Sequence, residues 1–185
     1  ALRLVAGREQ AQAIAAVAYG TKTISRYVKV VGPGSPWVVA AKRLLADLID
    51  TGTPAGPSEA IIFADETTDG RLAALDLLIE AEHGDDSSAF IVTTSRDVAD
   101  AALAAIPTYW HRMSAQRVNF TKAVLISSRG GILLAKDAAE AMAFINDYAP
   151  EHLQILSKDP RKYLPLIKNA GEILLGEHTP STLGN

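Results

Sequence analysis

An acidic residue and a histidine stand side by side after a proline. Pro150 ends a helical segment, so Glu151 and His152 come at the start of a predicted strand. A histidine can take the proton of an alcohol while hydride leaves the carbon, and a neighbouring carboxylate can activate water. Adjacent strand residues point to opposite faces, so both reach one pocket only if the backbone is irregular there. The alternative is a polar loop with two solvated side chains.

A second pair with metal-binding chemistry lies at the end of a predicted helix. Glu80 and His83 are three residues apart, so they project from one helical face. A carboxylate and an imidazole are both zinc ligands, and this spacing lets them reach a single ion. A histidine that only caps the helix end explains the same pattern, and for an isolated pair that role is the more common one.

Two loops combine glycine or proline with a polar side chain. Ser35 follows a Gly-Pro-Gly turn that leads from a predicted strand into a helix, an arrangement that suits an anion. The turn lacks the six-residue glycine fingerprint of standard dinucleotide folds, so a plain tight turn is an equal alternative. Ser58 lies in a loop over residues 54–59 whose prolines fix its direction, although a simple β-turn is again an alternative.

Short apolar runs alternate with alanine-rich helical stretches along the chain. Strands are predicted over residues 2–5, 28–31, 60–64, 89–93, 123–126, 152–156 and 172–175. Helices are predicted over residues 10–19, 37–45, 71–82, 97–105, 136–148 and 160–168. Ser95 is placed to cap the fourth of these helices. Residues 110–129 are the least regular and are expected to form a surface excursion.

The alternation predicts an α/β fold, a Rossmann-like, mostly parallel sheet with helices on both faces. Ligands of such sheets lie beyond the carboxyl ends of the strands, so function is expected in the loops that follow strands. No internal repeat, low-complexity tract or long linker marks a domain boundary. Residues 1–185 are therefore expected to form a single catalytic portion.

Composition excludes several function classes. The 185 residues carry a formal net charge of -3, and the charged residues are interspersed, which argues against a nucleic-acid surface or a membrane-surface helix. Cysteine is absent, which excludes disulfides, thiolate catalysis and all-cysteine zinc sites. No apolar run reaches the roughly 18 residues of a spanning helix. The absence of cysteine is compatible with a cytoplasmic location.

A set of segments, taken in order and approximate spacing, resembles the histidinol dehydrogenase family. The resemblance covers essentially the whole chain, and the linked set is specific although each piece alone is weak. The matching segments are residues 12–16, 19–21, 31–34, 41–43, 54–59, 62–67, 76–78, 81–84, 148–153, 170–171, 175–176 and 179–180.

The family oxidises L-histidinol to L-histidine through the aldehyde, in two NAD-dependent steps at one zinc-containing site. The resemblance implies that His152 is the general base and that Glu151 activates water in the aldehyde step. It implies that Ser58 contacts the substrate. Glu80 and His83 would ligate zinc and, through it, hold the substrate.

The remaining implied contacts involve the cofactor and the metal. Gln12 matches a family contact to NAD, and Ser35 stands where another NAD contact is expected. Asn185 stands at the position of a further zinc ligand. Zinc in the family mainly orients the substrate against the nicotinamide.

Three of these positions depart from the family pattern. Glu80 stands where glutamine is usual, Asn185 where aspartate is usual, and Ser35 where asparagine is usual. The first two exchanges leave the formal charge of the metal shell unchanged, which predicts a retuned site. They leave open a paralogue that oxidises another amino-alcohol or polyol. A nucleotide-binding module without redox chemistry is a third hypothesis.

The chain is expected to be a fragment of a longer dehydrogenase. It starts inside a predicted strand and stops just after a Thr-Pro-Ser-Thr run. In the family, the last zinc ligand and other substrate contacts come from a C-terminal region donated by the partner subunit of a homodimer. The fragment alone is therefore predicted to bind zinc weakly and to turn over little or nothing, and the full-length chain to be a homodimer.

Overall fold

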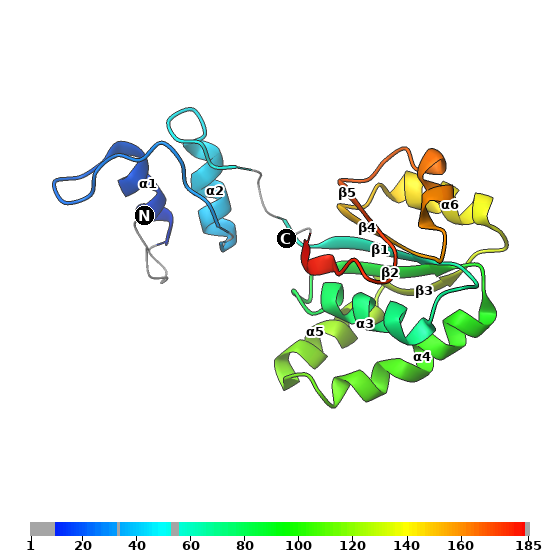
Figure 1. The fold of residues 1–185 in the computed structure, drawn as a ribbon. Helices are drawn as coiled ribbons and strands as arrows, with labels where there is room; N and C mark the ends of the chain where they lie inside the picture. The colour runs from blue at the N-terminus through cyan, green and yellow to red at the C-terminus, as the bar shows by residue number, and fades with distance from the viewer. Residues whose placement is uncertain (1–9, 33, 53–55, 184–185) are drawn as a thin grey trace. The chain divides into compact units, whose positions relative to one another are not determined.

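The computed structural model describes residues 10–32, 34–52 and 56–183. The chain divides into two compact units, residues 1–56 and residues 57–185 (Figure 1). The strand predicted over residues 2–5 lies outside the described residues. That residues 1–185 act as one catalytic portion stays a prediction, because each unit is packed by itself.

The first unit contains two helices, α1 (Gln10–Tyr19) and α2 (Pro36–Leu44). The bounds of α1 are those predicted, and α2 begins one residue early because Pro36 suits the first helical turn. Val17, Ala18 and Ile49 are buried together and form a small core.

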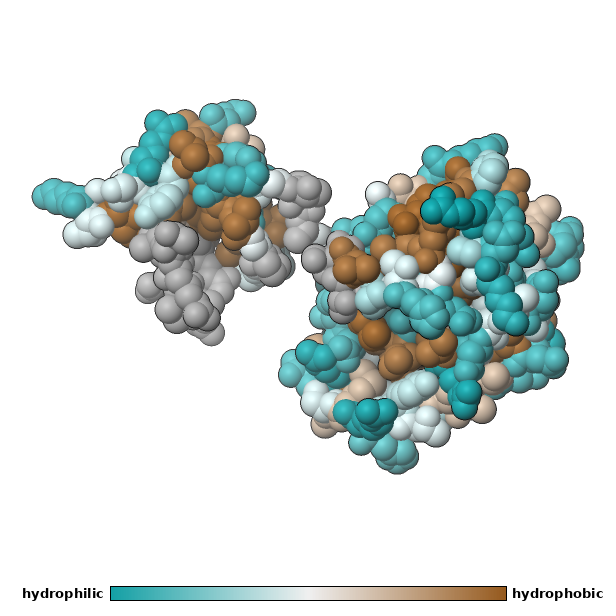
Figure 2. All heavy atoms as spheres, in the orientation of Figure 1, coloured by the Kyte–Doolittle hydropathy of each residue, from teal (hydrophilic) through white to brown (hydrophobic). Residues whose placement is uncertain are grey.

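The strand predicted over residues 28–31 is wrong. Only an isolated parallel bridge joins Lys29 to Asp50, and their side chains form an ion pair at 2.9 Å. Val28 and Val31 are exposed instead of packed, and among the described residues this β-branched run joins no sheet. Figure 2 shows apolar side chains at the surface of this unit.

The second unit is built on a five-stranded parallel sheet in the order β3-β2-β1-β4-β5. Its strands are β1 (Glu59–Ala64), β2 (Ser88–Thr93), β3 (Gly130–Leu134), β4 (His152–Leu156) and β5 (Glu172–Leu175). The chain winds outward from β1 to β3, then crosses to the other side for β4 and β5. This confirms the predicted parallel α/β fold.

Helices cover both faces of this sheet (Figure 1). One face carries α3 (Gly70–Ala81), α4 (Arg96–Trp110) and α5 (Ala115–Leu125). The other carries α6 (Ala138–Tyr148) and the 3-10 helix η1 (Pro160–Leu166), and a short 3-10 turn, η2 (Ser181–Leu183), follows β5. Among the described residues, no helix is long and apolar enough to cross a membrane.

Alternate residues of the central strand belong to different cores. Ile61 and Phe63 of β1 pack with α6, whereas Ile62 and Ala64 pack with α3 and α4. A parallel strand buried on both faces reads as a nearly continuous apolar run, and β1 and β2 do so after their first residues, whereas β4 carries the buried polar Gln154 at its centre.

Two predictions in residues 110–134 are wrong. Residues 123–125 are the last turn of α5 and Ile126 is its C-cap, so no strand lies there, and residues 110–129 are mostly helical instead of irregular. Ser114 caps α5 through the backbone N–H of Arg117. The true edge strand, β3, opens on two glycines and is only partly buried, so it lacks the apolar run that marks the other strands.

Gly70 gives a test of how closely α3 and α4 approach. A Cβ at this position would lie 2.4 Å from the carbonyl oxygen of Val98 and 2.9 Å from the backbone nitrogen of Ala102. We expect Gly70→Ala to lower the free energy of unfolding by about 2 kcal/mol, as overpacking against backbone does. Urea unfolding checks this, with Gly56→Ala as control because a Cβ there meets nothing within 4 Å. Equal midpoints for the two variants would contradict the close approach.

Candidate active site

The predicted catalytic and metal-binding residues of the second unit gather at the amino edge of the sheet. Ser58 directly precedes β1, and Glu151 and His152 open β4. Glu80 and His83 lie at the C-terminal end of α3, which runs antiparallel to the strands and so returns to this edge. The expectation that function lies in loops after strands is therefore wrong for these residues.

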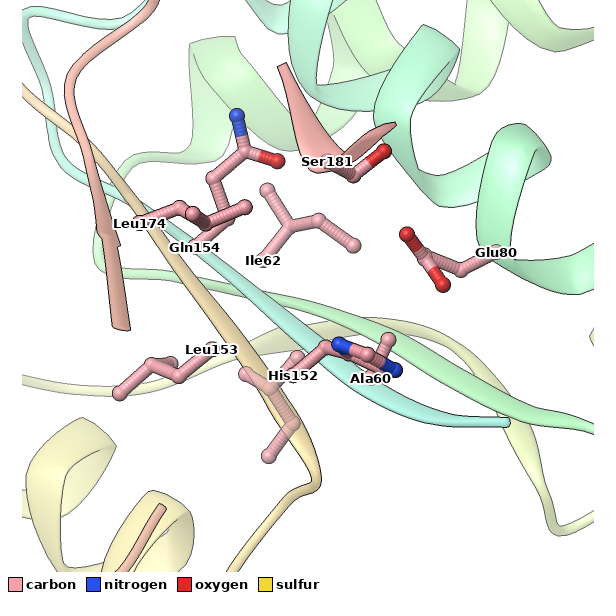
Figure 3. A pocket seen from close by; sticks show the side chains of 9 residues that line it. Ala60, Ile62, Glu80, His152, Leu153, Gln154, Leu174 and Ser181 are labelled. Carbon is pink, nitrogen blue, oxygen red and sulfur yellow. The ribbon is translucent and has the colours of Figure 1, made fainter. Parts of the chain in front are cut away.

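A small pocket lies among these elements (Figure 3). The cavity volume is about 10 Å³, which is close to the space that a single water molecule needs. Figure 3 shows the Glu80 side chain pointing from α3 into the space beside His152 and Ser181. The lining residues are Ala60, Ile61, Ile62, Glu80, His152, Leu153, Gln154, Leu174 and Ser181.

Glu80 is the polar group in this pocket that most needs a partner. Glu80 is 3% exposed, and both of its carboxylate oxygens are buried without a hydrogen-bond partner among the described residues. Burying an unpaired carboxylate is costly, so such a group is normally paired with a cation or a metal. The sequence indicated Glu80 through its spacing from His83 and through the family resemblance, whereas its burial is a new observation.

His83 is the second candidate metal ligand at the end of α3, and it is not among the residues that line the pocket. Nδ1 of His83 lies 3.2 Å from the backbone oxygen of Glu80, which leaves Nε2 of this exposed ring for another contact. Within the part of the chain that the structure describes, no three His, Cys, Asp or Glu residues are grouped to hold a metal. The third candidate ligand, Asn185, lies outside the described residues. That Glu80 and His83 ligate one metal ion stays a prediction.

The His152 ring lies between two carboxylates. Its Nδ1 is 2.5 Å from Oε1 of Glu172, and its Nε2 is 3.5 Å from Oε2 of Glu151. The His152 side chain is 13% exposed and that of Glu151 is 52% exposed. Glu151 reaches the ring because it precedes the regular strand, after Ala149 ends α6 with a positive φ of 54°. The irregular backbone that the sequence required is present.

Glu172 is a site residue that sequence reasoning missed. The parallel register pairs His152 of β4 with Glu172 of β5, although twenty residues separate them in sequence. The only available signal was that each residue opens a predicted strand and that neighbouring strands start at the same edge. Gly171 allows the approach, since a Cβ there would lie 2.6 Å from the Glu151 carbonyl oxygen.

Asp76 and Gln154 were also missed. Asp76 lies one helical turn before Glu80 on α3, and Gln154 of β4 is buried and donates a hydrogen bond to the carbonyl of Thr179. Burial raises the pKa of Asp76 from 3.8 to about 6; the hydrogen bond from Gln154 opposes this rise and the charge of Glu80 adds to it. The edge of the pocket is thus rich in carboxylates.

The raised pKa of Asp76 makes stability depend on pH. Between about pH 4 and pH 6 the unfolded chain releases this proton before the folded chain does, so stability falls through that window and stays lower above it. The free energy of unfolding falls by at most about 3 kcal/mol across this window. We expect Asp76→Asn to stabilise the metal-free protein by about 1–2 kcal/mol at pH 8 and to change little at pH 4.

Urea unfolding in the presence of a chelator, at both pH values, measures this difference. Asp100→Asn on the exposed side of α4 is the matched control and should have no effect at either pH. An equal gain for Asp76→Asn at pH 4 and pH 8 would contradict the buried-charge explanation.

The two predicted cofactor contacts lie in the first unit. Gln12 is exposed on α1, and Ser35 precedes α2 without using its hydroxyl to cap the helix. Gly32 has a φ of +117°, a conformation that favours glycine, and its carbonyl accepts a hydrogen bond from Lys42. Polar side chains and the N-terminal N–H groups of α2 have the chemistry to meet a nucleotide.

Comparison with known proteins gives consistent results. A sequence profile of the family described as histidinol dehydrogenase matches residues 6–185. A protein named histidinol dehydrogenase homolog 2 from Mesorhizobium japonicum is 65% identical, covering 95% of this chain and 40% of the relative. Histidinol dehydrogenase from Synechocystis is 56% identical, covering 92% of this chain and 39% of the relative.

A solved structure agrees with these relatives. The crystal structure of histidinol dehydrogenase from Elizabethkingia anophelis matches with a TM-score of 0.82 and 32% identity. The match covers 94% of this chain and 39% of that chain. The chain thus spans about two fifths of the length of the relatives that it matches.

Proposed function

Because the chain belongs to the histidinol dehydrogenase family, we propose that it forms part of the active site of an NAD-dependent, zinc-requiring dehydrogenase. The proposed reaction oxidises L-histidinol to L-histidine through the aldehyde. The observation that carries the proposal is that His152 and the buried, unpartnered Glu80 carboxylate line the same pocket. One group suits proton transfer and the other suits a cation, as alcohol oxidation at a metal site requires.

His152 would act on the substrate hydroxyl. Its Nε2 takes the O–H proton while the carbon loses hydride, so that the alcohol becomes an aldehyde. NAD, when bound, accepts that hydride at its nicotinamide ring. The low exposure of His152 limits competition from water for the same nitrogen.

Glu151 would act in the second oxidation. Its exposed carboxylate beside His152 can take a proton from a water molecule, which adds to the aldehyde carbon. Loss of a second hydride then gives the carboxylate. The balanced reaction consumes one alcohol, one water and two NAD, and it yields one carboxylate, two NADH and the released protons.

Glu80 and His83 would hold the zinc, with Asn185 and a residue of the partner subunit completing the shell. Bound zinc would fix polar groups of the substrate and so orient its reacting carbon. Ser58, at the same edge of the sheet, would contact the substrate, and Gln12 and Ser35 would contact NAD. In this proposal the full-length protein is a cytoplasmic homodimer, and residues 1–185 alone turn over little or nothing.

A paralogue that oxidises a different amino-alcohol or polyol is the second candidate. It is favoured by the Glu80 carboxylate, which stands where the family usually has glutamine and is fully enclosed in the pocket. With Asn185 in place of the usual aspartate, the exchange keeps the formal charge of the metal shell but moves it to another ligand, which changes what the shell holds best. A nucleotide-binding module would not need the Glu151 and His152 pair.

The first experiment is NAD reduction by the full-length protein, loaded with zinc and offered L-histidinol. Two NADH per histidinol support the first candidate. No turnover from a folded, metal-loaded protein contradicts it, and a panel of other amino-alcohols and polyols then tests the second.

A further inference from the structure

The His152 ring contacts a carboxylate that is distant in sequence and that takes no part in the proposed reaction steps. Glu172 opens β5 beside His152, and its Oε1 lies 2.5 Å from Nδ1. We propose that Glu172 is a positioning residue that keeps the proton of neutral His152 on Nδ1 and the lone pair on Nε2. This inference rests on the proposed function, in which Nε2 takes the proton of the alcohol.

The hydrogen-bond chemistry of the two groups carries this assignment. An ionised carboxylate only accepts hydrogen bonds, so the imidazole nitrogen that faces Glu172 must be the one that carries hydrogen. Neutral imidazole has one N–H, and Nε2 is then left bare. In other proteins, carboxylates orient catalytic and metal-binding histidines in this way.

The backbone holds this pair in place. The Glu172 N–H donates to the Glu151 carbonyl at 2.9 Å, and the Gly171 N–H donates to the Pro150 carbonyl at 2.9 Å. These bonds fix the starts of β4 and β5 beside each other in register. The side chains of His152 and Glu172 are 13% and 26% exposed, so bulk water only partly screens their contact.

The other carboxylate at the ring has a different place. Glu151 lies at 3.5 Å from Nε2, beyond hydrogen-bond distance, and its side chain is half exposed. It is therefore free to meet water, whereas Glu172 is held against the ring. Glu172 therefore orients the general base, whereas Glu151 contacts water.

Glu172→Gln in the full-length protein tests the proposal. The glutamine side chain is neutral and can either donate to Nδ1 or accept from it, so it no longer forces hydrogen onto Nδ1, and the tautomer with hydrogen on Nε2 and no lone pair on the substrate side becomes populated. We expect kcat to fall about 10- to 100-fold, with KM changed less than about threefold, because the ring stays but its proton is misplaced. Glu172→Asp, which keeps a carboxylate, should restore part of kcat.

A readout independent of activity is the tautomer of His152, measured by ¹⁵N NMR on histidine-labelled protein, with His152→Ala to assign the signal. We expect hydrogen on Nδ1 in the unaltered protein and in Glu172→Asp, and a shift toward Nε2 in Glu172→Gln. Glu66→Gln is the control, since this exposed residue follows β1 at the opposite edge of the sheet.

The outcomes separate the inference from the proposed function. An unaltered tautomer in Glu172→Gln overturns the positioning role, whatever happens to kcat. A protein that oxidises no alcohol, yet shows the tautomer change, contradicts the proposed function and leaves the assignment of Glu172 standing. Because glutamine matches glutamate in shape, the variant keeps the strand geometry; Glu172→Asp provides a second folded variant for the same comparison.

Discussion

His152→Ala in the full-length protein is expected to lower kcat about 10³-fold while leaving the affinities for NAD and alcohol within a few-fold. His152 supplies the imidazole that lines the pocket beside Glu80, and imidazole is the side chain that most often serves as a general base. Alanine leaves the strand backbone and its register with β1 and β5 intact. Steady-state kinetics together with binding measurements separate the two effects.

His111→Ala is the matched control for that experiment. His111 lies at the exposed end of α4 and undergoes the same chemical change away from the pocket, so kcat should be unaltered. If His152→Ala turned over as fast as the unaltered protein, the general-base role would be wrong. The chain would then fit the nucleotide-binding module better.

Glu80→Gln is expected to lower zinc affinity about 10- to 100-fold, and Glu80→Ala to lower it further. The buried carboxylate has two unpartnered oxygens, so a cation gains both a ligand and a compensating charge there. Glutamine keeps the shape and one ligating oxygen but removes the charge. Competition with a chelator of known affinity measures the difference in the full-length protein.

Glu80 stands where the family usually has glutamine, and Asn185 where it usually has aspartate. This pair of exchanges allows a sharper test. If Glu80 and Asn185 share the metal shell, adding Asn185→Asp to Glu80→Gln returns the original charge and should recover most of the zinc affinity. Glu82→Gln is the control, because Glu82 lies near the same helix end but pairs with Arg117. Unchanged affinity and turnover in Glu80→Gln would contradict a metal-binding role for Glu80.

The sequence predicts the parts of this fold whose pattern reflects complete burial. β1 and β2 are enclosed on both faces and read as apolar runs, and the bounds predicted for β4 and β5 match the structure. β3 lies at the sheet edge and begins with glycines, so its pattern is weak. In α5, Thr121 and Val124 are the buried residues, and the β-branched Val124 was taken for part of a strand.

Some residues of the candidate site are close together in sequence, and others meet only through the fold. Glu151 with His152, and Glu80 with His83, are neighbours in sequence, so their types and spacing made them candidates, and the family resemblance gave them their expected roles. Glu172 joins His152 only through the β4–β5 register, which no local pattern contains. The amino-edge location was missed because the usual rule for parallel sheets places ligands at the carboxyl ends.

The direction of α3 has an electrostatic consequence for this edge. The last carbonyls of a helix carry about half a negative elementary charge, and α3 ends where Glu80, Glu151 and Glu172 gather. At the opposite edge, α3, α4 and α6 begin, each with its positively polarised N–H groups. The two ends of one sheet thus attract ligands of opposite sign. Capture of a cation at the amino edge should slow as salt is added, since ions in solution screen that attraction.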